Sequence, residues 1–249
     1  MLLGEPPRTQ ADLNFSLLGI PVRVHPLFWL MALLLGYHIM SDAASVLIWF
    51  AAVFIGVLVH EMGHALTMRA YGYYPWITLY SFGGLASYDQ RYASRSTGSG
   101  PLGQVLISLA GPGAGFLLAA LLLLGIVAAG YGKALYFFGT GMPIPRFFLP
   151  DSRQGDLLDQ LLFVCVAWGV LNLLPIYPLD GGQIAREVLL QLNSREGIRR
   201  SMQLSIFAAA AVAIFWFFQW KTFFVPLMFG YLAYSNFIAL KAYGFRGPW

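Results

Sequence analysis

The chain has few charged residues and a single cysteine. Charged residues make up 10% of its 249 residues and apolar residues 58%, whereas a soluble domain has about 25% charged residues. The lone cysteine, Cys165, excludes an internal disulfide. A net charge of +4 is too small to suggest nucleic acid as a partner. These scarcities predict an integral membrane protein whose surroundings are the lipid bilayer.

Long apolar runs account for most of the sequence and are expected to be transmembrane helices. Six of them lie at about 26–40, 45–68, 102–129, 157–174, 202–220 and 223–240. The first is shorter than the roughly 20 residues that a span needs. After the second span, residues 71–92 are rich in aromatic and β-branched side chains, which is typical of strands.

The sequence therefore predicts an all-α polytopic membrane protein with about six transmembrane helices and a small membrane-associated β-hairpin or sheet after the second span. We expect one membrane-embedded domain, 1–249, with an N-terminal surface arm at 1–24. With six spans, eleven of the fifteen Lys and Arg residues lie on the side that carries both termini. The positive-inside rule then places both termini in the cytoplasm, and we expect a multi-pass protein of the bacterial inner membrane.

Five consecutive residues interrupt the second apolar run: His60-Glu61-Met62-Gly63-His64. An ionisable group at membrane depth costs about 2.5–3.5 kcal/mol on insertion scales, so such groups indicate function. His60 and His64, four residues apart, share one helix face and can bind one metal ion. Glu61 is placed to act as general base, as in other H-E-x-x-H sequences. The alternative, two helix-packing histidines with a chance glutamate, is disfavoured in an apolar span of a chain with four histidines.

A catalytic zinc site usually has three protein ligands, so a third must come from elsewhere. Thr67 and Ala70 stand where a metzincin would have Gly and His, which excludes that pattern. Asp180 is the best-placed carboxylate, because it follows the fourth span and a segment that Pro175 and Pro178 keep from being helical. The second and fourth spans run in the same direction, so their ends reach the same, cytoplasmic side.

Two alternatives stay open at this point. Asp180, with Gln183 three residues later, also resembles the N-terminal cap of a short helix over 183–192. Asn172, in the apolar fourth span, could make an interhelical hydrogen bond, or its amide could bind the substrate backbone or a developing oxyanion.

Taken together, these residues resemble the motifs of the site-2 protease family, which are intramembrane zinc metalloproteases. The matching motifs are His60-Glu61-x-x-His64, Gly111-Pro112, Asn172-Leu-Leu-Pro175 and Pro178-Leu-Asp180-Gly181. The resemblance covers about 19–193, with a catalytic core at about 45–193. It implies one zinc ion held by His60, His64 and Asp180, with Glu61 as general base and Asn172 near a transmembrane protein substrate.

The resemblance also places Gly83 and Gly84 in a membrane-associated β element, whose edge is thought to receive the extended substrate by strand addition. The chain departs from the family pattern at Gly115, where Asn is frequent. It has no room for a PDZ or a CBS domain, so a minimal member is expected.

Two functions from other classes remain as alternatives. A polytopic metal transporter would also place His and Asp in its spans, but it would have little use for Glu61 as a non-ligand. A catalytically inactive metal-binding homologue would lack a ligand or the base, and none is missing here. Glu61 therefore favours catalysis over metal binding alone.

Overall fold

The computed structural model describes residues 5–36, 42–81, 83–89, 100–129, 135–137, 145–147, 153–220 and 223–245. The chain forms two compact units, each described by itself. The first unit consists of Met1–Ser96 and Ala110–Val170, and the second of Thr97–Leu109 and Leu171–Trp249.

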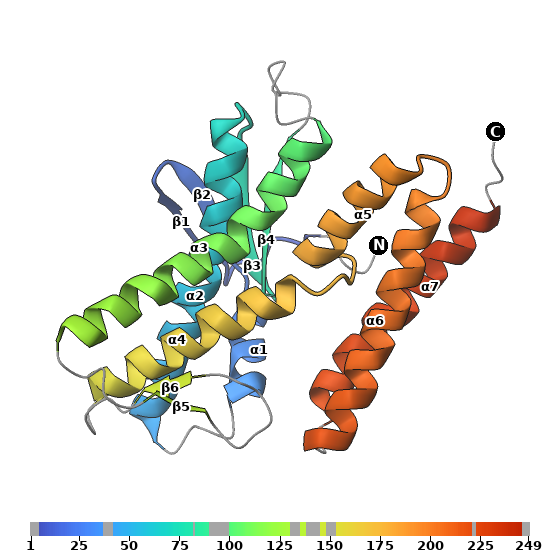
Figure 1. The fold of residues 1–249 in the computed structure, drawn as a ribbon. Coiled ribbons are helices and arrows are strands. Elements are labelled where there is room, and N and C mark those ends of the chain that lie inside the picture. The colour runs from blue at the N-terminus through green and yellow to red at the C-terminus, as the bar shows by residue number, and fades with distance from the viewer. Residues whose placement is uncertain are drawn as a thin grey trace. The chain divides into compact units, whose positions relative to one another are not determined.

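The first unit contains a sheet whose described strands run in the order β1-β2-β3-β4. The strands are β1 (Leu13–Leu17), β2 (Ile20–Val24), β3 (Pro75–Tyr80) and β4 (Gly83–Tyr88). β2 and β3 are parallel, and the crossover between them consists of α1 (Pro26–Gly36) and α2 (Ala43–Ala70) (Figure 1). The antiparallel pair β3–β4 confirms the hairpin predicted after the second apolar run. The predicted N-terminal arm, however, contributes β1 and β2 to the same sheet.

One face of the sheet forms the core of the first unit. Val22 pairs with Ile77 and Val24 with Leu79, and all four side chains are at most 2% exposed. Because successive strand residues point to opposite faces, these residues lie on one face. They belong to one hydrophobic cluster with residues of α1, α2, α3 and α4.

The opposite face of the sheet is covered by the N-terminal segment. Arg23 of β2 donates to Glu5 Oε1 at 3.1 Å, to Asp12 Oδ2 at 3.2 Å and to the Pro6 carbonyl at 2.8 Å. Thr78 of β3 also donates to Glu5, at 2.5 Å. Apolar and polar residues thus alternate along β2 and β3. The apolar side chains pack on the helices, and the polar ones bind residues 5–12.

The remaining elements are helical apart from two short strands. They are α3 (Pro101–Ala128), β5 (Leu135–Phe137), β6 (Pro145–Phe147), α4 (Arg153–Asn172), α5 (Asp180–Leu192), α6 (Gly197–Trp220) and α7 (Phe224–Phe245). α3 continues through Pro112. In the second unit, α6 contacts both α5 and α7 (Figure 1).

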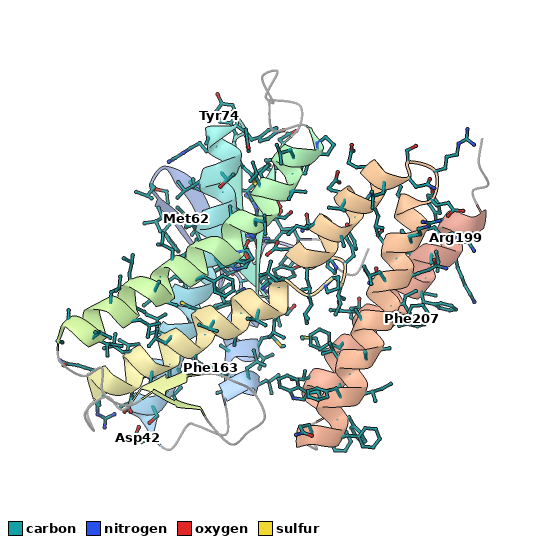
Figure 2. The ribbon with its side chains drawn as sticks, in the orientation of Figure 1. Asp42, Met62, Tyr74, Phe163, Arg199 and Phe207 are labelled. Atoms are coloured by element: carbon teal, nitrogen blue, oxygen red, sulfur yellow. The ribbon has the colours of Figure 1, made fainter. Side chains whose placement is uncertain are left out.

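Within the described residues, four helices are long and apolar enough to cross a membrane: α2, α3, α4 and α6. They carry exposed apolar side chains such as Phe163 and Phe207 (Figure 2). The prediction of six spans is not confirmed. α1 has eleven residues, and residues 37–40 of its predicted span lie outside the described part. α7 is not among the four.

α2 begins after a capping aspartate, Asp42. Asp42 accepts hydrogen bonds from the Ser45 amide at 2.7 Å and the Ser45 hydroxyl at 2.8 Å. It also pairs with Arg153 at 3.3 Å. These interactions, the Ser45 amide first, lower the pKa of Asp42 from 3.8 to about 2.

The cap makes the stability of the first unit depend on pH. Because the folded pKa of Asp42 lies below its unfolded value, its contribution is fully present above about pH 4 and is lost as the pH falls toward 2. Asp42→Ala is therefore expected to lower Tm near pH 7, with a difference from wild type that narrows below about pH 4. Asp42→Asn, which keeps the acceptor but not the charge, should lose less. A deficit of equal size near pH 7 and near pH 2 would contradict this account.

Candidate metal centre

The H-E-x-x-H residues lie on the unbroken helix α2 and are buried. His60, Glu61 and His64 are 2%, 4% and 6% exposed. The two histidine Nε2 atoms are 3.2 Å apart, and their ring centroids are 4.9 Å apart. Two imidazoles on one tetrahedral zinc ion, each at about 2.0–2.1 Å, would have their nitrogens about 3.3 Å apart. The i, i+4 spacing therefore produces the pairwise geometry that one zinc ion requires.

Glycines of α2 and α3 allow close approach beside the histidines. A Cβ at Gly111 would lie 2.1 Å from His64 Nε2, and a Cβ at Gly63 would lie 2.2 Å from the Ala110 carbonyl oxygen. Gly63 therefore leaves space for the backbone of α3. Gly111 faces the Nε2 atom of His64. Any side chain at 111 would occupy the space next to that atom.

Glu61 lies against the strand β4. A Cβ at Gly84 would be 2.2 Å from Glu61 Cγ and 2.5 Å from Oε1. The carboxylate is therefore next to the backbone of the last strand in the sheet order. Burial raises the pKa of Tyr80 on the neighbouring strand, and the negative charges of Glu61 and Glu5 raise it further.

Trp168 of α4 is a neighbour of the site that sequence reasoning did not identify. Its ring is edge-on to His60, with centroids 6.4 Å apart. A Cβ at Gly83, whose φ is +101°, would lie 2.1 Å from Trp168 Cζ2. A tryptophan one turn before Asn172 in an apolar span was the available signal. Gly83 is the residue that can adopt this backbone conformation and leave room for the indole.

In the second unit, Asp180 is the first residue of α5 and is 6% exposed. The N-cap position belongs to Leu179, which makes no side-chain capping bond. The open alternative, Asp180 as cap of a helix over 183–192, is therefore wrong, because the helix begins three residues earlier. The helical break predicted at Pro175 and Pro178 is confirmed between α4 and α5.

His60 and His64 of the first unit and Asp180 of the second are each buried, and each offers one atom that could bind a metal ion. Two imidazoles and one carboxylate are a donor set that zinc prefers, and three ligands leave one position open for water or substrate. Gly111 also leaves space beside His64 in which a zinc ion could be bound. The residues present are therefore suited to zinc.

Asn172, the predicted substrate-binding amide, is the last residue of α4 and is half-buried. Its role and that of Gly83 and Gly84 toward a substrate stay predictions.

Comparison with known proteins places the chain in a family. The model of Peptidase family M50 matches residues 48–143 and 149–216. A zinc metalloprotease of Methanocaldococcus jannaschii is 25% identical over 91% of this chain and 56% of its own length. A Synechocystis sp. protein, which its name assigns provisionally to the zinc metalloproteases, is 29% identical over 74% of this chain and 46% of its own. The chain thus spans about half the length of these relatives.

A solved structure supports the fold assignment. The site-2 protease from Methanocaldococcus jannaschii matches with a TM-score of 0.56 and 22% identity, over 92% of this chain and 95% of that one. Since the family model covers more than half of the sequence, the chain belongs to Peptidase family M50. The likeness in fold to a site-2 protease is confirmed, and the protein is a multi-pass integral membrane protein.

The fit of Gly111 against His64 leads to a prediction with a matched control. Gly111→Ala should weaken zinc binding by at least about tenfold, because the new methyl group displaces the His64 ring from its ligand position. Gly113→Ala, on the same helix, should bind zinc like wild type, since a Cβ there meets nothing within 4 Å. Chelator competition on the two purified variants measures the difference. Equal zinc affinities would show that Gly111 does not set the position of His64.

Proposed function

We propose that this protein is an intramembrane zinc metalloprotease that hydrolyses peptide bonds in or next to transmembrane segments of membrane proteins. The observation that carries the proposal is the buried carboxylate of Glu61 between two histidines suited to one metal ion. A buried carboxylate at this place needs a charged partner or a chemical task. Membership of family M50 and the zinc metalloprotease relatives support the same function.

We assign one zinc ion per chain to His60, His64 and Asp180. The donor set and the burial of all three residues support this assignment. Zinc bound there would supply Lewis-acid activation of a water molecule and of the scissile carbonyl. Glu61 then accepts a proton from the attacking water as the new C–O bond forms at the carbonyl carbon. It returns that proton to the leaving amine nitrogen as the C–N bond breaks.

The substrate is proposed to approach as an extended strand. A peptide bond inside a helix is shielded by its own hydrogen bonds, so a transmembrane substrate must unwind locally before hydrolysis. β4 is at the end of the described sheet order, and its Gly84 lies against Glu61. A substrate strand paired with β4 would therefore run close to the general base. We assign Gly83 and Gly84 to this docking edge and Asn172 to the substrate backbone or the developing oxyanion.

We propose that α1 and α7 complete a six-helix arrangement in a bacterial inner membrane, with both termini in the cytoplasm and the active site toward the cytoplasmic side. The distribution of Lys and Arg supports this topology.

A membrane-impermeant thiol reagent should label a cysteine added after residue 249 only in inverted vesicles. Labelling in right-side-out vesicles would contradict this topology.

Neither alternative function accounts for Glu61 as well. A metal transporter has no use for a carboxylate that does not bind the metal, and an inactive homologue would lack either a ligand or the base. The candidate ligands and the base are all present in this chain.

Glu61→Gln tests the proposed mechanism. The variant should retain zinc, because Glu61 is not assigned as a ligand, and should cleave a transmembrane peptide at least about 100-fold more slowly, because the general base is lost. Zinc content and peptide cleavage are measured on the purified full chain in detergent.

Two controls make this result specific. Glu196→Gln removes an exposed carboxylate that binds Arg200 and should leave both quantities unchanged. Asp180→Asn should lose zinc and cleavage together. Cleavage at the wild-type rate by Glu61→Gln would overturn the proposed function, and zinc uptake into vesicles would favour transport.

A further inference from the structure

The segment between α4 and α5 ends at Asp180, and its backbone has lost helical partners. Pro175 and Pro178 have no N–H group. The segment forms its own turns, in which the Ile176 amide donates to the Leu174 carbonyl at 2.7 Å and the Leu179 amide to the Ile176 carbonyl at 2.8 Å. These local bonds shape the turns, and they leave the peptide groups of Tyr177 to be bound from elsewhere.

Two buried polar side chains of the second unit bind the backbone of Tyr177. The Tyr177 amide donates to Ser205 Oγ of α6 at 2.9 Å, and Asn236 Nδ2 of α7 donates to the Tyr177 carbonyl at 2.7 Å. Ser205 is 1% exposed and Asn236 is 3% exposed, whereas Tyr177 is 40% exposed. The two helices therefore bind this residue through its backbone.

Each of these side chains is itself fixed by a second hydrogen bond. The Ser205 hydroxyl donates to the Ser201 carbonyl at 2.9 Å, so its lone pairs are left to accept from Tyr177. Asn236 Nδ2 also donates to the Leu232 carbonyl, at 2.9 Å. Both contacts reach back one turn on their own helix. The orientation of each group toward Tyr177 is thus set by regular helical backbone.

The position of Tyr177 is transmitted to Asp180 through a tightly packed turn. A Cβ at Gly182 would lie 2.3 Å from the Tyr177 nitrogen, and a Cβ at Gly181 would lie 2.1 Å from the Leu173 carbonyl oxygen. The first turn of α5 therefore rests directly on the segment that Ser205 and Asn236 bind. Such packing has little room to shift without moving Asp180.

We propose that Ser205 and Asn236 are positioning residues that hold the Asp180 carboxylate ready for the metal. This inference rests on the proposed function, in which Asp180 is the third zinc ligand. Outer groups that orient metal ligands commonly change metal affinity by 10–100-fold when they are removed. The inference gives a task to two buried polar side chains, since burying a polar group is costly unless it is hydrogen-bonded.

The test measures zinc affinity and the stability of the zinc-free protein separately. Ser205→Ala and Asn236→Leu should each weaken zinc binding by about tenfold or more in chelator competition with the full chain. Ser201→Ala is the matched control, because its hydroxyl is equally buried on α6 but donates to the Ile198 carbonyl. It should bind zinc like wild type. The Tm of the zinc-free variants is measured beside the affinities, so that a loss of overall stability is told apart from a loss of zinc affinity.

Three outcomes decide between the possibilities. The inference would be overturned if Ser205→Ala and Asn236→Leu bound zinc as tightly as Ser201→Ala does. If one of the two variants fails to fold, the zinc affinity of the other decides the test. If those three variants bind zinc equally well and Asp180→Asn loses zinc, the positioning role is wrong but the proposed function stands. Wild-type zinc affinity in Asp180→Asn would instead overturn the proposed ligand set, and the positioning role with it.

Discussion

The structure depends on the burial of His60, Glu61 and His64 within one turn of the apolar helix α2. Isolated charges in such surroundings are expensive, and a metal ion is the partner that can stabilise two imidazoles and leave a neighbouring carboxylate ionised. The geometry around them follows from this need. The two imidazole nitrogens converge at 3.2 Å, and the carboxylate one step along the helix turns toward the backbone of β4 instead. One helix thus supplies two candidate ligands and a separate proton acceptor.

Close packing at this turn relies on residues without side chains. Gly63, Gly84 and Gly111 each stand where a Cβ would come within 2.5 Å of another group, and those groups are the neighbouring helix, Glu61 and His64. Small residues allow helices in a membrane to approach each other closely. Here they also determine the space available to the chemically active groups. This explains why the site is built against α3 and β4, which bring backbone and no side chain to it at these positions.

The sequence predicted the parts that local patterns determine. The helix of the H-E-x-x-H residues, the hairpin at Gly83–Gly84 and the break before Asp180 follow from periodicity, from aromatic and β-branched composition and from proline chemistry. The two N-terminal strands were missed, because β2 pairs in parallel with β3, about 55 residues away, and β1 joins the sheet by pairing with β2. The start of α5 was misplaced, since helix ends shift by a few residues. Ser205 and Asn236 were missed because their partner is a backbone group distant in sequence, although polar residues in apolar helices were the available signal.

X-ray absorption at the zinc edge tests most directly the central claim, that two histidines and one aspartate hold a single zinc ion. The account predicts one zinc per chain, with about two imidazole nitrogens at roughly 2.0–2.1 Å, carboxylate or water oxygen at roughly 2.0–2.2 Å and no sulfur neighbour. In Asp180→Asn the oxygen contribution should change while the imidazole signal of any remaining zinc persists. A sulfur ligand at about 2.3 Å, which would implicate Cys165, or a spectrum that Asp180→Asn leaves unchanged, would contradict the account.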